Sequence, residues 1–208
     1  MPKKMVADGG YDFNGSLVNN ANIPDVGGAF PLSGYGLVAA SGDPAAFLGA
    51  NSNIPSGQTY FARVWVRAGV PITNLWVAVR TAGVYTTSAV PNQLAIYDNS
   101  GNQTGITANN NNLFTSAGWR GGALITPIPA QSTGRFCYIG LIPGGVSAAL
   151  TVAFHSGTDN NQVAWFNTPV TGGNRRCMWN SGQTALPSSF DPATYGNATT
   201  FLPLVGAS

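Results

Sequence analysis

This chain of 208 residues has no Glu, and its only Lys residues are Lys3 and Lys4. Charged residues make up 8% of it, against about 25% in an ordinary soluble domain. Glu and Lys usually cover exposed helix faces, whereas Asn, Ser, Thr and Gly favour strands, turns and caps. The shortage of Glu and Lys therefore argues against a helical fold.

Long basic runs and long apolar runs are also missing. The net charge is +2, and the longest basic run is Arg175-Arg176, so binding of nucleic acid through its phosphates is not expected. No apolar run has the length of a membrane span. Lys3 and Lys4 precede no apolar segment of the kind found in secretory signals, so we expect a protein made and assembled in a cytoplasm.

Residue types that carry catalysis are scarce. His155 is the only histidine, and no Gly-x-Ser-x-Gly sequence accompanies it, so we expect a histidine at a strand end or an interface and no catalytic residue. A glycosidase would need two Asp carboxyls, but several Asp stand in turns, including Asp98. Polysaccharide processing is therefore the less favoured alternative.

Metal sites and cofactors are not expected either. Asp98–Asn102 has oxygen ligands at alternate positions, as a calcium loop does, but it offers one carboxylate and no closing Glu. Two Cys and one His without paired spacing do not form a zinc site. Cys137 and Cys177 could pair, although buried free thiols are the favoured interpretation in a reducing compartment.

What the chain does contain is typical of a β protein: 44% hydrophobic residues, 27 Gly and 14 Pro. Leu94–Thr107 alternates apolar residues up to the turn cluster Asp98–Asn102 and then resumes, which predicts a hairpin. Together with a strand that begins at Thr59, the sequence has eight or more expected strands, and this number predicts a two-sheet antiparallel β-sandwich. The other expected strands are Ile72–Arg80, Gly121–Ile128, Arg135–Ile142, Leu150–His155, Gln162–Asn167 and Arg176–Asn180.

Residues 1–50 differ from residues 51–208. The first segment holds two Lys and four Asp, a net charge of −2, whereas the rest holds seven Arg and three Asp, a net charge of +4. We expect an extended N-terminal arm for assembly or docking over 1–50 and the sandwich over 51–208. Alternatively, Leu37–Ala40 and Ala45–Leu48 each add a short strand to the sandwich.

The strand from Thr59 carries large residues on both faces. One face has Tyr60 and every second residue after it, as expected for a core. The other face has a stripe that predicts contact with a second layer, the arm or a neighbouring subunit. The expected subunit-interface residues are Phe61, Arg63, Trp65 and Arg67.

Four aromatic residues lie beside Gly-rich or Asn-rich segments: Tyr85, Trp119, Trp165 and Trp179. An aromatic ring next to amide side chains can hold the apolar face of a sugar while the amides bind its hydroxyls. These residues are the glycan-binding candidates. The alternative is that they belong to the core or to subunit contacts.

Four segments in order, Ile72–Gly83, Leu94–Asn102, Gly134–Ile142 and Gly182–Pro187, resemble a jelly-roll domain found in minor tail proteins of phages that infect actinobacteria. The resemblance covers about residues 72 to 190 and implies an all-β, jelly-roll-like antiparallel β-sandwich. It also implies a place in a virion, and it carries over no catalytic residue.

The resulting expectation is a non-enzymatic structural protein of a bacteriophage virion, most directly a minor tail or tail-fibre component that contributes to attachment to host glycans. A capsid decoration or head protein that stabilises the shell is the alternative. Expected partners are other virion proteins, further copies in a homo-oligomer of trimeric or higher symmetry, and host cell-wall glycan.

Overall fold

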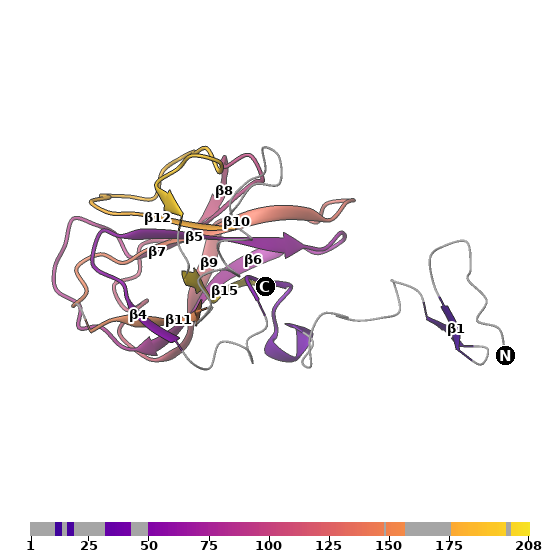
Figure 1. The fold of residues 1–208 in the computed structure, drawn as a ribbon, viewed down its shortest axis with the longest axis horizontal. Helices are drawn as coiled ribbons and strands as arrows, with labels where there is room; N and C mark the ends of the chain where they lie inside the picture. Colours follow the sequence, from indigo (N-terminus) through magenta and orange to yellow (C-terminus); the bar gives the residue numbers. More distant parts are fainter. Residues whose placement is uncertain are drawn as a thin grey trace.

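A computed structural model describes residues 11–13, 16–18, 32–42, 50–147, 149–156, 176–198 and 201–208. Within these ranges the only helix is a single 3₁₀ turn, η1 (Leu32–Tyr35). The rest of the regular structure consists of strands, and Figure 1 shows two sheets stacked face to face. The expected all-β antiparallel sandwich is confirmed.

One layer is a six-stranded sheet in which every pairing is antiparallel. Its centre is formed by β5 and β10, which are joined along seven residue pairs from Arg135↔Val66 to Leu141↔Tyr60. In spatial order the strands are β13 (Asn197–Ala198), β12 (Cys177–Asn180), β5 (Thr59–Val66), β10 (Arg135–Ile142), β7 (Gln93–Tyr97) and β8 (Gln103–Ile106).

The other layer is a seven-stranded antiparallel sheet built around β6 (Ile72–Thr81). From β5 to β12 the chain changes sheet after every strand except within the hairpin β7–β8. The remaining strands are β14 (Phe201–Pro203), β11 (Thr151–Ser156), β15 (Val205–Ala207), β3 (Ala39–Ala40), β4 (Ala50–Asn53) beside β11, and β9 (Gly118–Ile128) beside β6.

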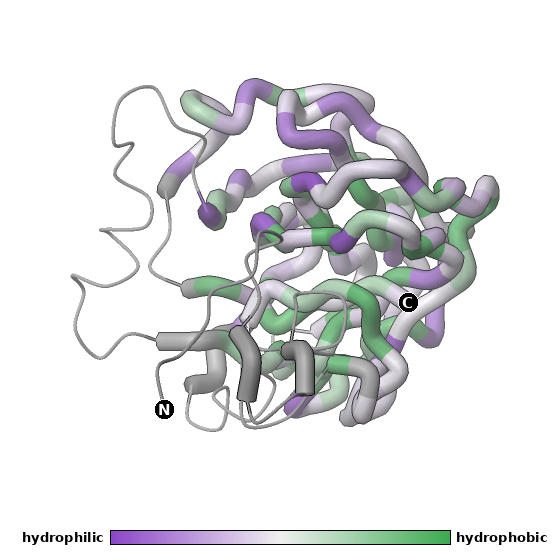
Figure 2. The backbone as a smooth tube through the Cα atoms, turned by 90° about the vertical axis from the view of Figure 1, so that its right-hand side faces the viewer, coloured by the Kyte–Doolittle hydropathy of each residue, from purple (hydrophilic) through white to green (hydrophobic). Residues whose placement is uncertain are grey.

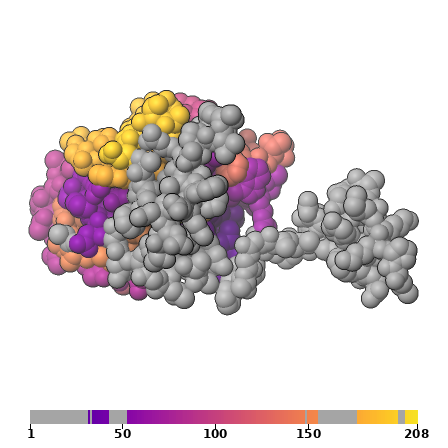
Figure 3. Space-filling model, in the orientation of Figure 1, coloured from indigo at the N-terminus to yellow at the C-terminus, as the bar shows by residue number. Residues whose placement is uncertain are grey.

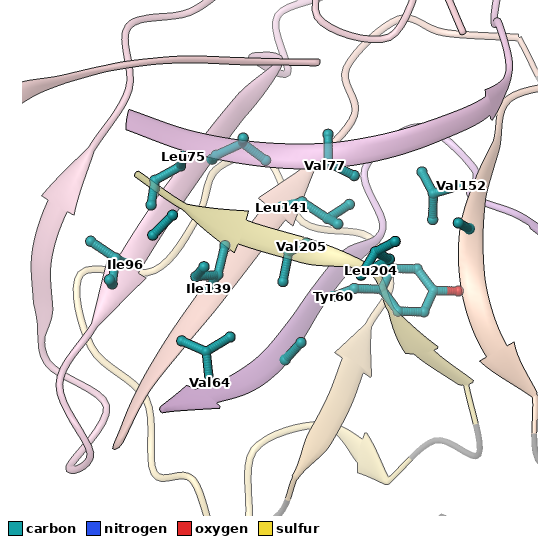
Figure 4. Close-up of a cluster of buried hydrophobic side chains, with 14 of the residues drawn as sticks. Tyr60, Val64, Leu75, Val77, Ile96, Ile139, Leu141, Val152, Leu204 and Val205 are labelled. Carbon is teal, nitrogen blue, oxygen red and sulfur yellow. The ribbon is translucent and has the colours of Figure 1, made fainter. Parts of the chain in front are cut away.

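The main core lies between the two sheets. The expected inward face of β5 is confirmed, because Tyr60, Ala62, Val64 and Val66 all belong to this buried cluster. Figure 4 shows side chains from both sheets, such as those of Ile139 and Val205, pointing toward one another in this space. In Figure 2 hydrophilic stretches are frequent in the loops along the upper edge of the view.

A second apolar cluster covers part of the outer face of the six-stranded sheet. Phe61 is fully buried there, and Phe190 lies 4.5 Å from it between ring centroids. The covering segment follows β12, and Figure 3 shows yellow atoms of the chain after residue 176 at the top of the view. The other buried members of this cluster are Ala95, Tyr97, Tyr138, Ile142, Met178 and Leu186.

The predicted hairpin is present as β7 and β8. The Asp98 carboxylate accepts hydrogen bonds from the backbone N–H groups of Ser100 and Asn102, each at 2.9 Å. Gly101 has a φ of 85°, and a Cβ at this position would collide with the backbone oxygen of Phe190. The turn is therefore held both by its own Asp98 and by the segment that covers the outer face.

Part of the segment expected as an arm belongs to the sandwich. Leu37 is buried, and β3 pairs with β15 in the seven-stranded sheet. β1 (Tyr11–Phe13) and β2 (Ser16–Val18) form a separate two-stranded hairpin. Docking by the segment before residue 32 stays a prediction, and the possible strands Ala45–Leu48 and Gln162–Asn167 lie outside the described residues.

Cys137 and Cys177 are both buried, and no disulfide joins them to each other. Cys137 pairs with Val64 on one side of β5, and Cys177 pairs with Ala62 on the other side. Two strand spacings separate these cysteines by about 10 Å, which is farther than a disulfide spans. The register of β5 therefore keeps the two thiols apart.

Candidate functional site

Two exposed aromatic rings lie side by side on the outer face of the six-stranded sheet. Trp65 on β5 is paired with Phe136 on β10, and cross-strand partners share a face of the sheet. Their ring centroids are 4.8 Å apart at an angle of 68°, and the residues are 49% and 42% exposed. They form an apolar surface that the described chain leaves about half exposed.

Arg63 extends this surface. Its guanidinium lies 4.0 Å from the centroid of the Phe136 ring and 6.0 Å from that of Tyr138, within the range of cation–π attraction. The Nη2 group donates a hydrogen bond of 2.7 Å to Asn99 Oδ1 in the hairpin turn. The Nε atom is buried and has no hydrogen-bond partner among the described residues.

A pocket of about 360 Å³ opens next to these side chains, and we call it the Arg63 pocket. The backbone N–H of Arg63 donates to the Arg176 carbonyl at 2.8 Å, which brings the second arginine to the pocket. Burial lowers the pKa of the Arg176 guanidinium, which still stays charged at neutral pH. The described lining residues are Ala40, Ser41, Arg63, Trp65, Phe136 and Arg176.

Ser41 joins the pocket to the sheet behind it. Its hydroxyl donates to the Pro203 carbonyl at 2.7 Å and accepts from the Val205 N–H at 3.1 Å. Its own carbonyl accepts a hydrogen bond of 3.2 Å from Arg176 Nη2. Arg176 thus links the six-stranded sheet to the seven-stranded one at this end of the sandwich.

The four expected interface residues occupy different environments. Phe61 lies inside the second apolar cluster, while Arg63 and Trp65 line the Arg63 pocket and Arg67 is exposed just beyond the end of β5. The alternation of residue types along β5 was enough to predict which of its side chains point outward. Sequence reasoning missed three residues of the pocket, namely Phe136, Ser41 and Arg176, because the register with β10 and the approach of β3 bring them here. A signal existed for Phe136, since it lies two residues before Tyr138 and therefore on the same face of β10.

The glycan candidates do not form one surface. Trp119 lies on β9 in one sheet, Trp179 on β12 in the other, and Tyr85 in the loop after β6. All three are partly buried and pack against the main core. Trp165 lies outside the described residues.

Asp98 and Asp191 both have roles in turns. Partial burial acts to raise the pKa of the Asp98 carboxyl, but hydrogen bonds from Asn102, Ser100 and Gly101 outweigh it and leave the pKa below its usual value. The Asp191 carboxylate accepts from the N–H of Ala193 and from the hydroxyl of Thr194, each at 2.9 Å. Both interactions are those of turn-forming aspartates.

Groups of other kinds were also sought in the described part of the chain. It contains no cluster of three or more His, Cys, Asp or Glu placed to hold a metal ion. The backbone of His155 pairs with Leu202 near the end of β11. None of the described helical structure has the length and apolar character needed to span a membrane.

The Arg63 pocket offers aromatic rings and two guanidinium groups, and its described lining has no carboxylate. Such a surface suits a group that combines an aromatic or apolar plane with a negative charge.

A comparison of the chain with protein-family models found no match, and a comparison with curated proteins found none either.

Proposed function

We propose that this protein is a non-enzymatic structural subunit of a bacteriophage particle, present in many copies and exposed on its surface. The observation that carries the proposal is the uncovered Trp65–Phe136 pair with Arg63 beside it on the outside of the sandwich. Trp and Arg are the residue types that most often dominate the energy of protein interfaces. This surface would be the contact through which copies join one another or a neighbouring virion protein.

A place in the tail is favoured over a place on the capsid shell. The resemblance of residues 72 to 190 to minor tail protein domains supports the tail. The uncharged Asn-rich and Gly-rich loops support a role at an exposed position. There, several weak contacts with cell-wall glycan would add to a strong attachment through multivalency.

Immunogold labelling of intact particles tests this proposal. Antibodies raised against the purified protein are expected to place gold at the tail end. Gold distributed over the shell would instead establish the capsid decoration alternative. Particles without any gold, in a lysate in which the protein is detected, would end the virion assignment.

Adhesion to glycan is tested separately with isolated host cell walls. The wild-type protein in oligomeric form is expected to sediment with the walls. Substitution of the partly buried Trp119 by Phe keeps an aromatic ring at this position, whereas Trp119→Ala removes it. Binding that is lost in Trp119→Ala and kept in Trp119→Phe would support Trp119 as a sugar platform, and equal binding of both variants would remove it from the site.

A further inference from the structure

We propose that the Arg63 pocket binds the N-terminal segment that carries β1 and β2 in a second copy of this chain. The inference rests on the proposed assembly of copies and names the two surfaces that meet. It joins two parts of the chain that the described structure leaves without a partner, namely the β1–β2 hairpin and the exposed aromatic surface at Trp65.

The hairpin needs a surface on which to pack. Among the described strands, β1 and β2 pair only with each other, in the register Tyr11↔Val18, Asp12↔Leu17 and Phe13↔Ser16. An isolated two-stranded hairpin is marginally stable in water and needs a further strand or a packing partner. The sandwich of the same chain supplies no strand to it within the described residues.

The two parts of the chain are complementary in residue type and in charge. In the hairpin register Tyr11 is paired with Val18 and Phe13 with Ser16, and three of these four residues are of apolar or aromatic type. The Arg63 pocket presents an apolar surface of the same kind through Trp65 and Phe136. Aromatic pairs across such a contact add about 0.5–1.5 kcal/mol beyond the area that they bury.

Charge favours the same pairing. Residues 5–31 contain three Asp and neither Lys nor Arg, and in the sequence Asp12 lies in β1 and Asp8 lies three residues before it. The pocket provides the guanidinium groups of Arg63 and Arg176, and its described lining has no acidic residue. A carboxylate at the pocket would give Arg63 a charged partner beyond its single hydrogen bond to Asn99.

The chain is long enough for a contact between copies. The thirteen residues 19–31 connect the hairpin to η1 and can extend about 45 Å at 3.3–3.6 Å per residue. A contact in which one copy gives its hairpin and receives another is heterologous, and it forms a closed ring when the rotation between copies closes. The expected trimer or higher symmetry is compatible with such a ring.

Two full-length variants test the contact. The pocket variant carries Arg63→Asp and Trp65→Thr, and the hairpin variant carries Asp12→Lys and Phe13→Ser. Val84→Ser is the matched control, because Val84 is also apolar and is 69% exposed at a site away from the pocket lining. Circular dichroism and thermal unfolding establish that each variant is folded.

Light scattering during size-exclusion chromatography is expected to show a concentration-dependent oligomer for the wild-type protein and for Val84→Ser. Each of the two test variants alone is expected to dissociate at concentrations at least tenfold higher than those at which the wild type dissociates. When the two variants are mixed, the intact hairpin of one can enter the intact pocket of the other. A one-to-one complex should therefore appear only in the mixture.

A monomeric wild-type protein, variants that associate as the wild type does, or a mixture without a complex would each overturn the proposal. If the pocket variant does not fold, the hairpin variant alone remains decisive, because its substitutions lie outside the sandwich. A protein that immunogold places on the particle while the mixture forms no complex would lose the hairpin contact and keep its proposed function.

Discussion

Asn92 is a polar residue whose side chain is fully buried. Its Nδ2 group donates to the Gly144 carbonyl at 2.9 Å, and its Oδ1 atom accepts from the Gly144 N–H at 2.7 Å. The Asn92 amide thus hydrogen-bonds both backbone groups of Gly144, as the backbone of a neighbouring strand would. It ties the loop before β7 to the loop after β10.

Asn92→Ala is expected to lower the free energy of unfolding by about 2 kcal/mol, because it leaves both backbone groups of buried Gly144 without this partner. Urea unfolding followed by fluorescence measures the change. Asn111→Ala, at an exposed position, is the control and should stay within about 0.5 kcal/mol of the wild type. Equal midpoints for the two variants would contradict the role given to Asn92.

Three buried tyrosines predict a specific response to alkaline pH. Burial raises the pKa of Tyr60 to about 12 and also raises the pKa values of Tyr97 and Tyr138. A phenol whose pKa is higher in the folded state than in the unfolded state stabilises the fold fully below pH 10. This contribution is lost as the pH rises through the folded pKa.

The unfolding temperature is therefore expected to fall steadily above pH 10, and absorbance at 295 nm should show a group of phenols that ionise only near pH 12 or on unfolding. Tyr60→Phe removes one such group and should make the decline above pH 10 shallower. A titration in which every tyrosine ionises near pH 10 in the folded protein would contradict the assigned burial.

Among the elements, the β7–β8 hairpin depends most clearly on one residue. Gly101→Ala requires a side chain at a φ of 85° and places its Cβ against the Phe190 carbonyl, so a loss of about 1–3 kcal/mol is expected. Gly182→Ala is the matched control, since Gly182 has a φ of 69° but open space around a Cβ. Chemical denaturation should give Gly101→Ala a lower free energy of unfolding than Gly182→Ala. The reverse order would show that contact with Phe190 is unimportant.

In the sequence, η1 and β3 lie between the hairpin and β4, and β3 belongs to the sandwich. Removal of residues 1–31 is expected to leave the unfolding temperature close to that of the full chain. Removal of residues 1–41 also takes away buried Leu37, β3 and the hydroxyl of Ser41, so the unfolding temperature should fall by several degrees. Differential scanning calorimetry of both truncations measures this, and equal temperatures would mean that β3 contributes little.

Most strands could be predicted from the sequence because their signals are local. β5, β6, β7 and β10 alternate apolar residues between clear turn clusters, and their observed bounds lie within one residue of the predicted ones. The strands β13, β14 and β15 were missed. They are two or three residues long and gain their pairing from distant segments.

Local signals in the sequence also predicted part of the candidate site. Alternation along β5 placed Arg63 and Trp65 on an outward face, but it could not show that Phe61 on the same face is covered. That cover comes from Leu186, Phe190 and Tyr195, which are single apolar residues in a segment rich in turn residues. Only the folded chain brings them onto the sheet.

For the whole molecule, the seven-stranded sheet is completed by β15. This strand lies between β6 and β3, and Val205 and Ala207 are fully buried. The Trp76 Nε1 group also donates to Ser208 Oγ at 2.9 Å. A chain that ends at residue 204 is expected to be rapidly digested by a nonspecific protease, whereas residues 1–208 resist it. Equal resistance would mean that the sheet closes without β15.

Vectorial synthesis gives this arrangement a consequence in the cell. β6 and β3 leave the ribosome long before the residues that fill the gap between them have been translated. During that interval the edge of β6 that later pairs with β15 has no strand beside it, and it can pair with a strand from another nascent chain on the same polysome. Fast translation of residues 205–208, or a chaperone that covers this edge, would therefore influence how much correctly folded protein a cell yields.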